Sequence, residues 1–499
     1  MAGLLTALLL WRCWVAATLP ITGDEAYFIG WGRHPDWGFY DHPPMVGWWL
    51  AAQLTLGDHP LWLRLSAVLL PFVLSLMLLV AGRRADASSV GRSSADAAGG
   101  TCYQAAALLV PLLPSNVWNV LITTDTPLIY FSVLSGLAWL RVRAGGGHLS
   151  LALAAVGLAG AVLSKYFAAL LWLAYVVDTL TTQGRKPWRA LAAVSLACVP
   201  PLLLMGWWNS QHCWPNLMFN FINRNADIGP GWQHPVAYVG VLLYSLTPLA
   251  VAPLLPRVAP RPGPQAPRTL QVLAVVPLAA FGLLSLVKPV GLHWVLAFLP
   301  LALLALLQHG RPAFRTWRFF LAGLAMAHGV VVSLVLLMPM SAWRELAQFP
   351  SLALYLDTPP LAQALSRLGP TATLATLSYA QSATLAYHTH RPVIVFGTGS
   401  FHARQDDLDT DFRRLAGQDL LILSKPGRPQ DLAPLSPYFD NIHMESITHQ
   451  GLQYPVLRGQ GFRYERYRQE VLSQVLTRFY QLPGLLRHGV CPVSERYAR

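Results

Sequence analysis

Charged residues are scarce in this sequence. Only 12% of its 499 residues are Asp, Glu, Lys or Arg, whereas 54% are hydrophobic, and the mean hydropathy is +0.41. A typical soluble domain carries about 25% charged residues. So little charge over a chain of this length excludes an ordinary soluble protein and indicates a polytopic membrane protein.

Acidic residues are also fewer than basic ones, 23 against 36, which gives a formal net charge of +13. The basic residues are scattered, and the sequence contains no RNA- or DNA-binding motif, so we expect no nucleic acid among its partners. In a membrane protein, Lys and Arg collect in cytoplasmic loops. The positive charge is therefore interpreted as a topology signal.

The five cysteines show neither a CxxC pair nor metal-ligand spacing. Three lie in apolar stretches, where buried inert thiols are expected. Cys213 and Cys491 are both expected outside the cytoplasm, and both a disulfide between them and two separate thiols stay open. Walker, Rossmann, HExxH and GxSxG motifs are absent. His388 and His390 alone are weak evidence for a metal site, so we expect structural or surface roles for them.

Eleven apolar segments approach the length of about 20 residues that spans a bilayer. The N-terminal one lacks a basic leading region and is interpreted as a retained first helix. The expected spans are 2–20, 61–82, 101–118, 127–141, 149–164, 166–181, 190–208, 236–256, 269–287, 293–308 and 318–339. The predicted fold is a helical membrane protein with about 11 transmembrane helices.

The orientation follows from the basic residues, which cluster in alternate loops. The loops that are rich in basic residues contain Arg83, Arg84 and Arg92; Arg141 and Arg143; Arg185, Lys186 and Arg189; Arg257, Arg261 and Arg268; and Arg311, Arg315 and Arg318. These loops, including the proline-rich connector 259–267, are expected in the cytoplasm. The opposite loops are then periplasmic. Two helices that meet near Lys165 preserve this bias, whereas one long helix over 149–181 would invert it.

After residue 340 the composition changes. "TATLATLSYA", "RPVIVFG" and "QDLLILS" read as strands, and "SATLAYHTH" and "DLDTDFRRLAG" between them read as helices or turns. We therefore predict two domains: a transmembrane domain at 1–340, with a first periplasmic loop at 21–60, and a periplasmic α/β domain at 341–499. The predicted location is the bacterial inner membrane.

An acid pair, Asp24 and Glu25, directly follows the first apolar span. Acids suit a helix N-terminus, so the pair has a structural interpretation. A carboxylate at the edge of the bilayer could also act as a general base for an incoming hydroxyl or amine. In "FYDHPP", two prolines stiffen the chain after Tyr40, Asp41 and His42, which we predict to bind substrate. The alternative there is an aromatic membrane anchor.

Further candidates lie in other outer loops. Asp125 in "TTDTP" is a third acid, or a helix cap. Lys165, Arg224 and Lys288, with His293, are expected to bind an anionic headgroup, because a leaving phosphate needs positive charge nearby. The lysines could instead only extend to the membrane surface.

These motifs resemble the polytopic GT-C type glycosyltransferases. The similarity is greatest to the bacterial glycosyltransferase family 39 group, which is related to dolichyl-phosphate-mannose protein mannosyltransferases and to the lipid A aminoarabinose transferase. The resemblance rests on "GDEAYF", "YDHPP", "TTDTP", "LSKYF" and "KPVGLHW". It implies that Asp24 is the general base, with Glu25 beside it and Asp125 as a further acid. Aminoarabinose transferases often have lysine where this chain has His42. Some relatives use a divalent metal, so the cofactor stays open.

The resemblance implies an inverting transfer of a sugar from a polyprenyl-phosphate donor within the membrane. The acceptor would be a periplasmic lipid such as lipid A, a lipopolysaccharide sugar or other envelope glycan, or a protein. Two other classes remain open: a transporter or flippase of lipid-linked sugars, and a non-catalytic envelope scaffold. Polar groups at one membrane edge and the absence of an internal repeat favour the enzyme over the transporter.

Overall fold

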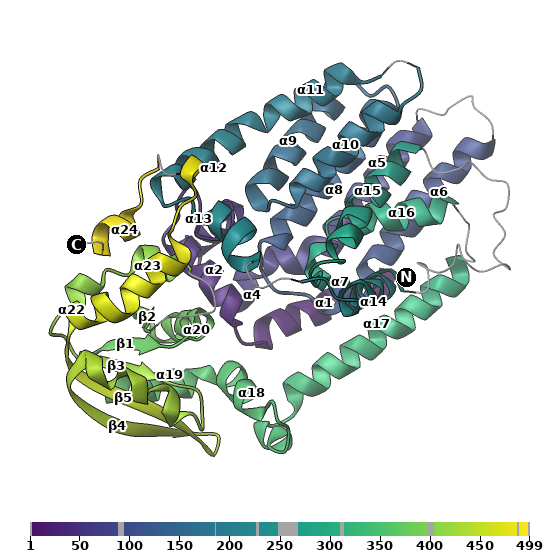
Figure 1. Ribbon diagram of the computed structural model, residues 1–499. Coiled ribbons are helices and arrows are strands. Elements are labelled where there is room, and N and C mark those ends of the chain that lie inside the picture. Colours follow the sequence, from purple (N-terminus) through teal and green to yellow (C-terminus); the bar gives the residue numbers. More distant parts are fainter. Residues whose placement is uncertain are drawn as a thin grey trace. The chain divides into compact units, whose positions relative to one another are not determined.

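The computed structural model describes residues 2–87, 94–184, 186–225, 229–247, 268–309, 314–397, 404–486 and 489–497 (Figure 1). The predicted connector 259–267 lies outside these residues. The chain forms two compact units. Unit 1 comprises 1–18, 61–203 and 228–336, and unit 2 comprises 19–60, 204–227 and 337–499. The loops 19–60 and 204–227 thus fold with the C-terminal segment rather than with the helices that flank them in sequence.

Unit 1 is helical. Its main elements are α1 (Ala2–Thr18), α5 (Leu65–Ala87), α6 (Ser94–Leu109), α7 (Pro114–Trp118), α8 (Asp125–Arg143), α9 (His148–Ser164), α10 (Ala168–Thr181), α11 (Trp188–Ala197), α14 (Gln233–Leu246), α15 (Arg268–Leu284), α16 (Leu299–His309) and α17 (Phe314–Leu337), and α12 (Val199–Gln211) crosses the boundary at Leu203. Each predicted span overlaps one or more of these helices. The predicted break near Lys165 is confirmed, since α9 ends at Ser164 and α10 starts at Ala168.

Helix length and composition together support fewer membrane spans than the eleven apolar segments predict. Among the described residues, three helical stretches are long and apolar enough to cross a bilayer: Leu65–Arg83, Trp188–Gln211 and Trp317–Leu337. A fourth is reached if the bent pair Ala2–Thr18 and Gly23–Arg33 is one span. Several other apolar helices have only 10–17 residues. The count of about 11 therefore stays a prediction.

Arg12 is a charged residue inside the first apolar segment, and its contacts explain how it is accommodated there. Its side chain is fully buried, and among the described residues its guanidinium donates to backbone carbonyls. The acceptors are Ala67, Val68, Asn116, Val117 and Asn119. Carbonyl groups at helix ends and in irregular backbone need donors when water is absent. Arg12 thus stabilises the chain that leads into α8.

Unit 2 contains a five-stranded sheet in the order β2-β1-β3-β5-β4. The strands are β1 (Thr373–Thr376), β2 (Val393–Val395), β3 (Leu420–Leu423), β4 (Phe439–His449) and β5 (Leu452–Phe462). The first three are parallel, and β5 pairs antiparallel with both β3 and β4. Gln450 and Gly451 join β4 to β5, and both have positive φ, as a two-residue hairpin turn requires.

At the central parallel strand β3 both faces of the sheet are buried, as is usual for parallel strands. Along β3, Leu420 and Ile422 face one core, while Leu421 and Leu423 face the other. The second core includes residues of α18 (Phe349–Leu356), α19 (Thr358–Leu368) and α20 (Tyr379–Thr389). The first includes residues of α22 (Tyr464–Tyr467), the π-helix η11 (Arg468–Leu472), α23 (Ser473–Phe479) and α24 (Pro492–Tyr497). The predicted α/β fold of the C-terminal segment is confirmed.

Unit 2 also contains the helices that carry the candidate site. These are α2 (Gly23–Arg33), α3 (Met45–Leu54), α13 (Pro215–Leu217), the π-helix η2 (Met218–Ile222), the 3₁₀-helix η3 (Asn223–Asn225) and α21 (Gln405–Asp409). A disulfide joins Cys213 to Cys491, 278 residues further along the chain. The sequence left open whether these two cysteines pair or stay separate thiols, and in the structure they pair.

Candidate functional site

The acid pair begins α2, and its two members have different surroundings. Thr22 is the N-cap: its hydroxyl accepts from the Glu25 amide, and the Glu25 carboxylate accepts from the Thr22 amide at 3.1 Å. This reciprocal arrangement is a capping box. Glu25 is fully buried, whereas Asp24 is exposed. The geometry therefore gives Glu25 the task of fixing the helix and leaves Asp24 accessible.

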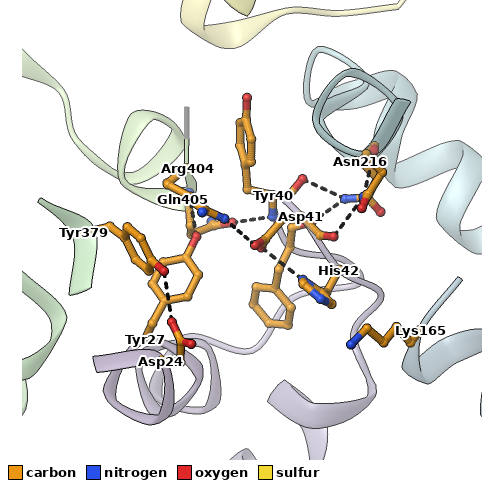
Figure 2. A network of polar contacts seen from close by, with 12 residues as sticks. Asp24, Tyr27, Tyr40, Asp41, His42, Lys165, Asn216, Tyr379, Arg404 and Gln405 are labelled. Carbon is orange, nitrogen blue, oxygen red and sulfur yellow. Dashed lines mark hydrogen bonds and ion pairs between the residues drawn. The ribbon is translucent and has the colours of Figure 1, made fainter. Parts of the chain in front are cut away.

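Asp24 is oriented by a residue from the C-terminal segment. The hydroxyl of Tyr379 donates to Asp24 Oδ1 at 3.0 Å (Figure 2). The two helices approach closely here, because a Cβ at Gly23 would lie only 2.8 Å from the Cβ of Ala380. Burial and the Asp24 carboxylate both raise the pKa of Tyr379, so its hydroxyl stays protonated as a donor.

Asp41 lies at the centre of an ionic cluster. Its Oδ2 accepts from Nη1 of Arg404 at 2.8 Å, and its Oδ1 lies 3.4 Å from Nδ1 of His42. Asp41 is only 4% exposed. Burial alone would raise its pKa, but His42 and Arg404 hold the pKa of Asp41 below its ordinary value. The carboxylate therefore stays ionised and holds the Arg404 guanidinium in place.

The backbone around Asp41 is held by side-chain amides. Asn216 donates to the carbonyls of Phe39 and Tyr40, and Asn220 donates to that of Asp41 at 3.1 Å. The Tyr40 amide donates to Gln405 Oε1 at 2.9 Å. The Tyr40 ring is itself fully buried, so Tyr40 anchors this loop in the hydrophobic core of unit 2. Figure 2 shows how these contacts converge on residues 40–42.

Two guanidinium groups flank one aromatic ring. Arg404 lies 4.7 Å from the ring centroid of Phe219, and Arg224 lies 5.9 Å from the same centroid. Burial and the neighbouring Arg404 lower the pKa of Arg224. Unit 2 thus contains six of the predicted residues: Asp24, Glu25, Tyr40, Asp41, His42 and Arg224.

The remaining predicted residues belong to unit 1. Lys165 Nζ contacts both oxygens of Asp125, at 2.8 and 2.9 Å, and the two residues are 8% and 5% exposed. Lys288 lies 5.6 Å from the ring centroid of Trp294. His293 is an exposed member of the 3₁₀-helix η6 (Leu292–Trp294). The predicted meeting of this set with Asp24 stays a prediction, since each unit is described by itself.

Sequence reasoning did not find Arg404, Tyr379, Gln405 or Asn216. Each lies far in sequence from its partner, and none stands in a motif with a chemical signature. Among the described residues, no group of three or more His, Cys, Asp or Glu side chains is arranged to hold a metal ion. The metal requirement therefore stays open.

Two solved structures of one protein match the fold over nearly the whole chain. The crystal structure of ArnT from Cupriavidus metallidurans in the apo state matches 91% of this chain and 97% of its own, with a TM-score of 0.63 and 16% identity. The same protein bound to undecaprenyl phosphate matches with a TM-score of 0.59 and 15% identity. The predicted GT-C resemblance is confirmed in the fold.

A curated relative adds a match in sequence. A stretch of 201 residues is 28% identical to the lipid A galacturonosyltransferase RgtD of Rhizobium johnstonii. It covers 38% of this chain and 38% of the length of that relative. No protein-family model matches the chain.

Proposed function

We propose that this protein is an inverting glycosyltransferase that moves a sugar from undecaprenyl phosphate to lipid A. The observation that carries the proposal is the exposed Asp24 carboxylate, oriented by Tyr379 in the unit that also holds the Arg404–Asp41–His42 cluster. The fold of ArnT, whose structure was solved with undecaprenyl phosphate, supports the donor. The named activity of RgtD supports the acceptor and the enzyme class.

In the proposed reaction, a hydroxyl oxygen of the acceptor attacks the anomeric carbon as the bond to the lipid phosphate breaks. Asp24 takes the proton of that hydroxyl, and the phosphate leaves with the electron pair of the broken bond. Tyr379 donates to Oδ1 of Asp24, and no hydrogen bond to Oδ2 is found among the described residues, so Oδ2 is proposed to receive the proton. Arg224 stabilises the growing negative charge on the phosphate. In unit 1, the binding of an anionic headgroup by Lys165 and Lys288 stays a prediction.

The site is proposed to face the periplasm of an inner-membrane protein. The Cys213–Cys491 disulfide lies in unit 2, and such bonds persist in oxidising compartments. The long apolar helices support a location in the membrane.

The test compares envelope lipids of cells with and without the gene by mass spectrometry. We expect lipid A that lacks one sugar residue in the deletion strain, and its return with the wild-type gene. Identical lipid A and identical envelope glycans in the two strains would contradict the proposal.

A further inference from the structure

Arg404 has a hydrogen-bonding edge that its ion pair does not use. Asp41 accepts from Nη1 alone. Nε is buried and has no hydrogen-bond partner among the described residues. Nε and Nη2 form the side of the guanidinium that binds a carboxylate with two parallel bonds. A buried donor without a partner is unfavourable, so this edge is suited to receive a ligand oxygen.

Two aromatic rings lie close to the Arg404 guanidinium. The guanidinium carbon of Arg404 lies 4.4 Å from the ring centroid of Tyr379 and 4.7 Å from that of Phe219. Cation–π attraction to both rings restrains the position of the guanidinium. The side chain is still 18% exposed. A planar anion that approaches the free edge would therefore meet a rigid, preoriented donor pair.

The proposed reaction already assigns one cation to the phosphate. Arg224 fulfils that role, and Arg404 is the second guanidinium at the same ring. A neutral sugar offers this edge of Arg404 only single hydroxyl oxygens, not two coplanar charged ones. A sugar that carries its own carboxylate would satisfy it.

We propose that Arg404 determines specificity by binding the carboxylate of a uronic acid, the sugar carried by the lipid-linked donor. This inference rests on the proposed function. The name of the relative RgtD, a galacturonosyltransferase, is consistent with this class of sugar.

The test uses the purified full-length protein, lipid A as acceptor, and two synthetic donors: undecaprenyl-phosphate galacturonic acid and its galactose counterpart. They differ only by a carboxylate against a hydroxymethyl group. The key variant is Arg404→Lys, which keeps a charge for Asp41 but loses the two-bond edge. Arg404→Gln removes both the positive charge and the two-bond edge. Arg413→Gln is the matched control, since Arg413 pairs with Asp411 at the surface of the same unit.

We expect the wild type to prefer the galacturonosyl donor. Arg404→Lys should lower kcat/KM for that donor about 10- to 100-fold, while the galactosyl rate changes less than about threefold. Arg413→Gln should match the wild type. If Arg404→Lys lowers both rates equally, Arg404 only positions Asp41 and the inference is wrong.

The two proposals fail in distinguishable ways. A wild-type enzyme that transfers galactose as well as galacturonic acid contradicts the role of Arg404 and leaves the transferase function intact. No transfer from either donor, while the deletion strain still lacks a lipid A sugar, also contradicts the uronic acid assignment alone. No transfer together with unchanged envelope lipids contradicts the transferase function itself.

Discussion

Nη1 of Arg404 lies 2.8 Å from Oδ2 of Asp41, although 363 residues separate the two in sequence. The C-terminal segment therefore does more than fold beside the first loop. It supplies the counter-ion of Asp41, and through Tyr379 it also orients Asp24. A chain truncated after α17 would lose both contacts, so the C-terminal segment is part of the candidate site.

Removal of one member of the buried Lys165–Asp125 ion pair should cost more folding stability than removal of both. Lys165→Met leaves the Asp125 carboxylate buried without its partner, which typically costs about 3–5 kcal/mol of folding stability. The double variant Asp125→Leu with Lys165→Met should regain much of that loss but not transferase activity. Thermal unfolding and sugar transfer, measured on the same detergent-solubilised samples, test this. A double variant with wild-type transfer would show that the pair is purely structural.

Glu25 should be needed for its hydrogen bonds and not for its charge. Glu25→Gln can still accept from the Thr22 amide, and Gln is common at this position of a capping box. We expect it to retain most transferase activity, whereas Glu25→Ala should lose roughly 0.5–2 kcal/mol of stability. Melting temperatures and initial rates of both variants decide the matter. An inactive but stable Glu25→Gln protein would instead make Glu25 a catalytic acid or base.

The stability of unit 2 should fall as the pH rises from about 4 to about 7. Burial, with the neighbouring acids Asp407 and Asp409, raises the pKa of Asp406 to about 7, and burial raises that of Asp407 to about 6. In this range the folded chain retains protons that the unfolded chain has released, so rising pH favours unfolding.

The variant Asp406→Asn removes one of these groups. Its melting temperature should exceed that of the wild type at pH 8, and the difference should shrink toward pH 5. Unfolding curves of both proteins, recorded across that range, provide the comparison. Parallel pH profiles would show that Asp406 does not bind a proton in the folded protein near neutral pH.

The disulfide predicts a defined thiol count. Thiol labelling of the denatured, unreduced protein should modify Cys13, Cys102 and Cys198 only. All five cysteines should react after reduction. Reduction should also lower the melting temperature of the wild type, while a Cys213→Ser and Cys491→Ser double variant should not respond. Five reactive thiols before reduction would rule out the bond and weaken the periplasmic assignment.

Much of the fold was predictable because hydrophobic patterns reflect burial. The three parallel strands are short apolar runs, and the break at Lys165 followed from charge bias. The hairpin β4–β5 was missed. In β4 most side chains are exposed and apolar residues do not alternate regularly, while β5 contains Pro455 and two glycines, which are unusual inside a strand.

The candidate site was predictable only in part. Asp24 and the Tyr40–His42 segment stand next to an apolar span and two prolines, which single them out. Arg404 directly precedes the acidic helix α21, so its sequence neighbours already explain it as a solvated partner of those acids. Its meeting with Asp41 depends on how the C-terminal segment folds back onto the first loop, and a single sequence contains no local signal for that.

The most direct test of the central claim is sugar transfer by Asp24→Asn, measured in membranes supplied with a labelled undecaprenyl-phosphate sugar and lipid A. Asn keeps the size and the acceptor oxygen for Tyr379 but cannot take a proton at neutral pH. Asp36→Asn is a control from the same loop. We expect transfer by Asp24→Asn to fall at least about 100-fold, as loss of a general base commonly does, with the control close to wild type. Wild-type transfer by Asp24→Asn would contradict the account.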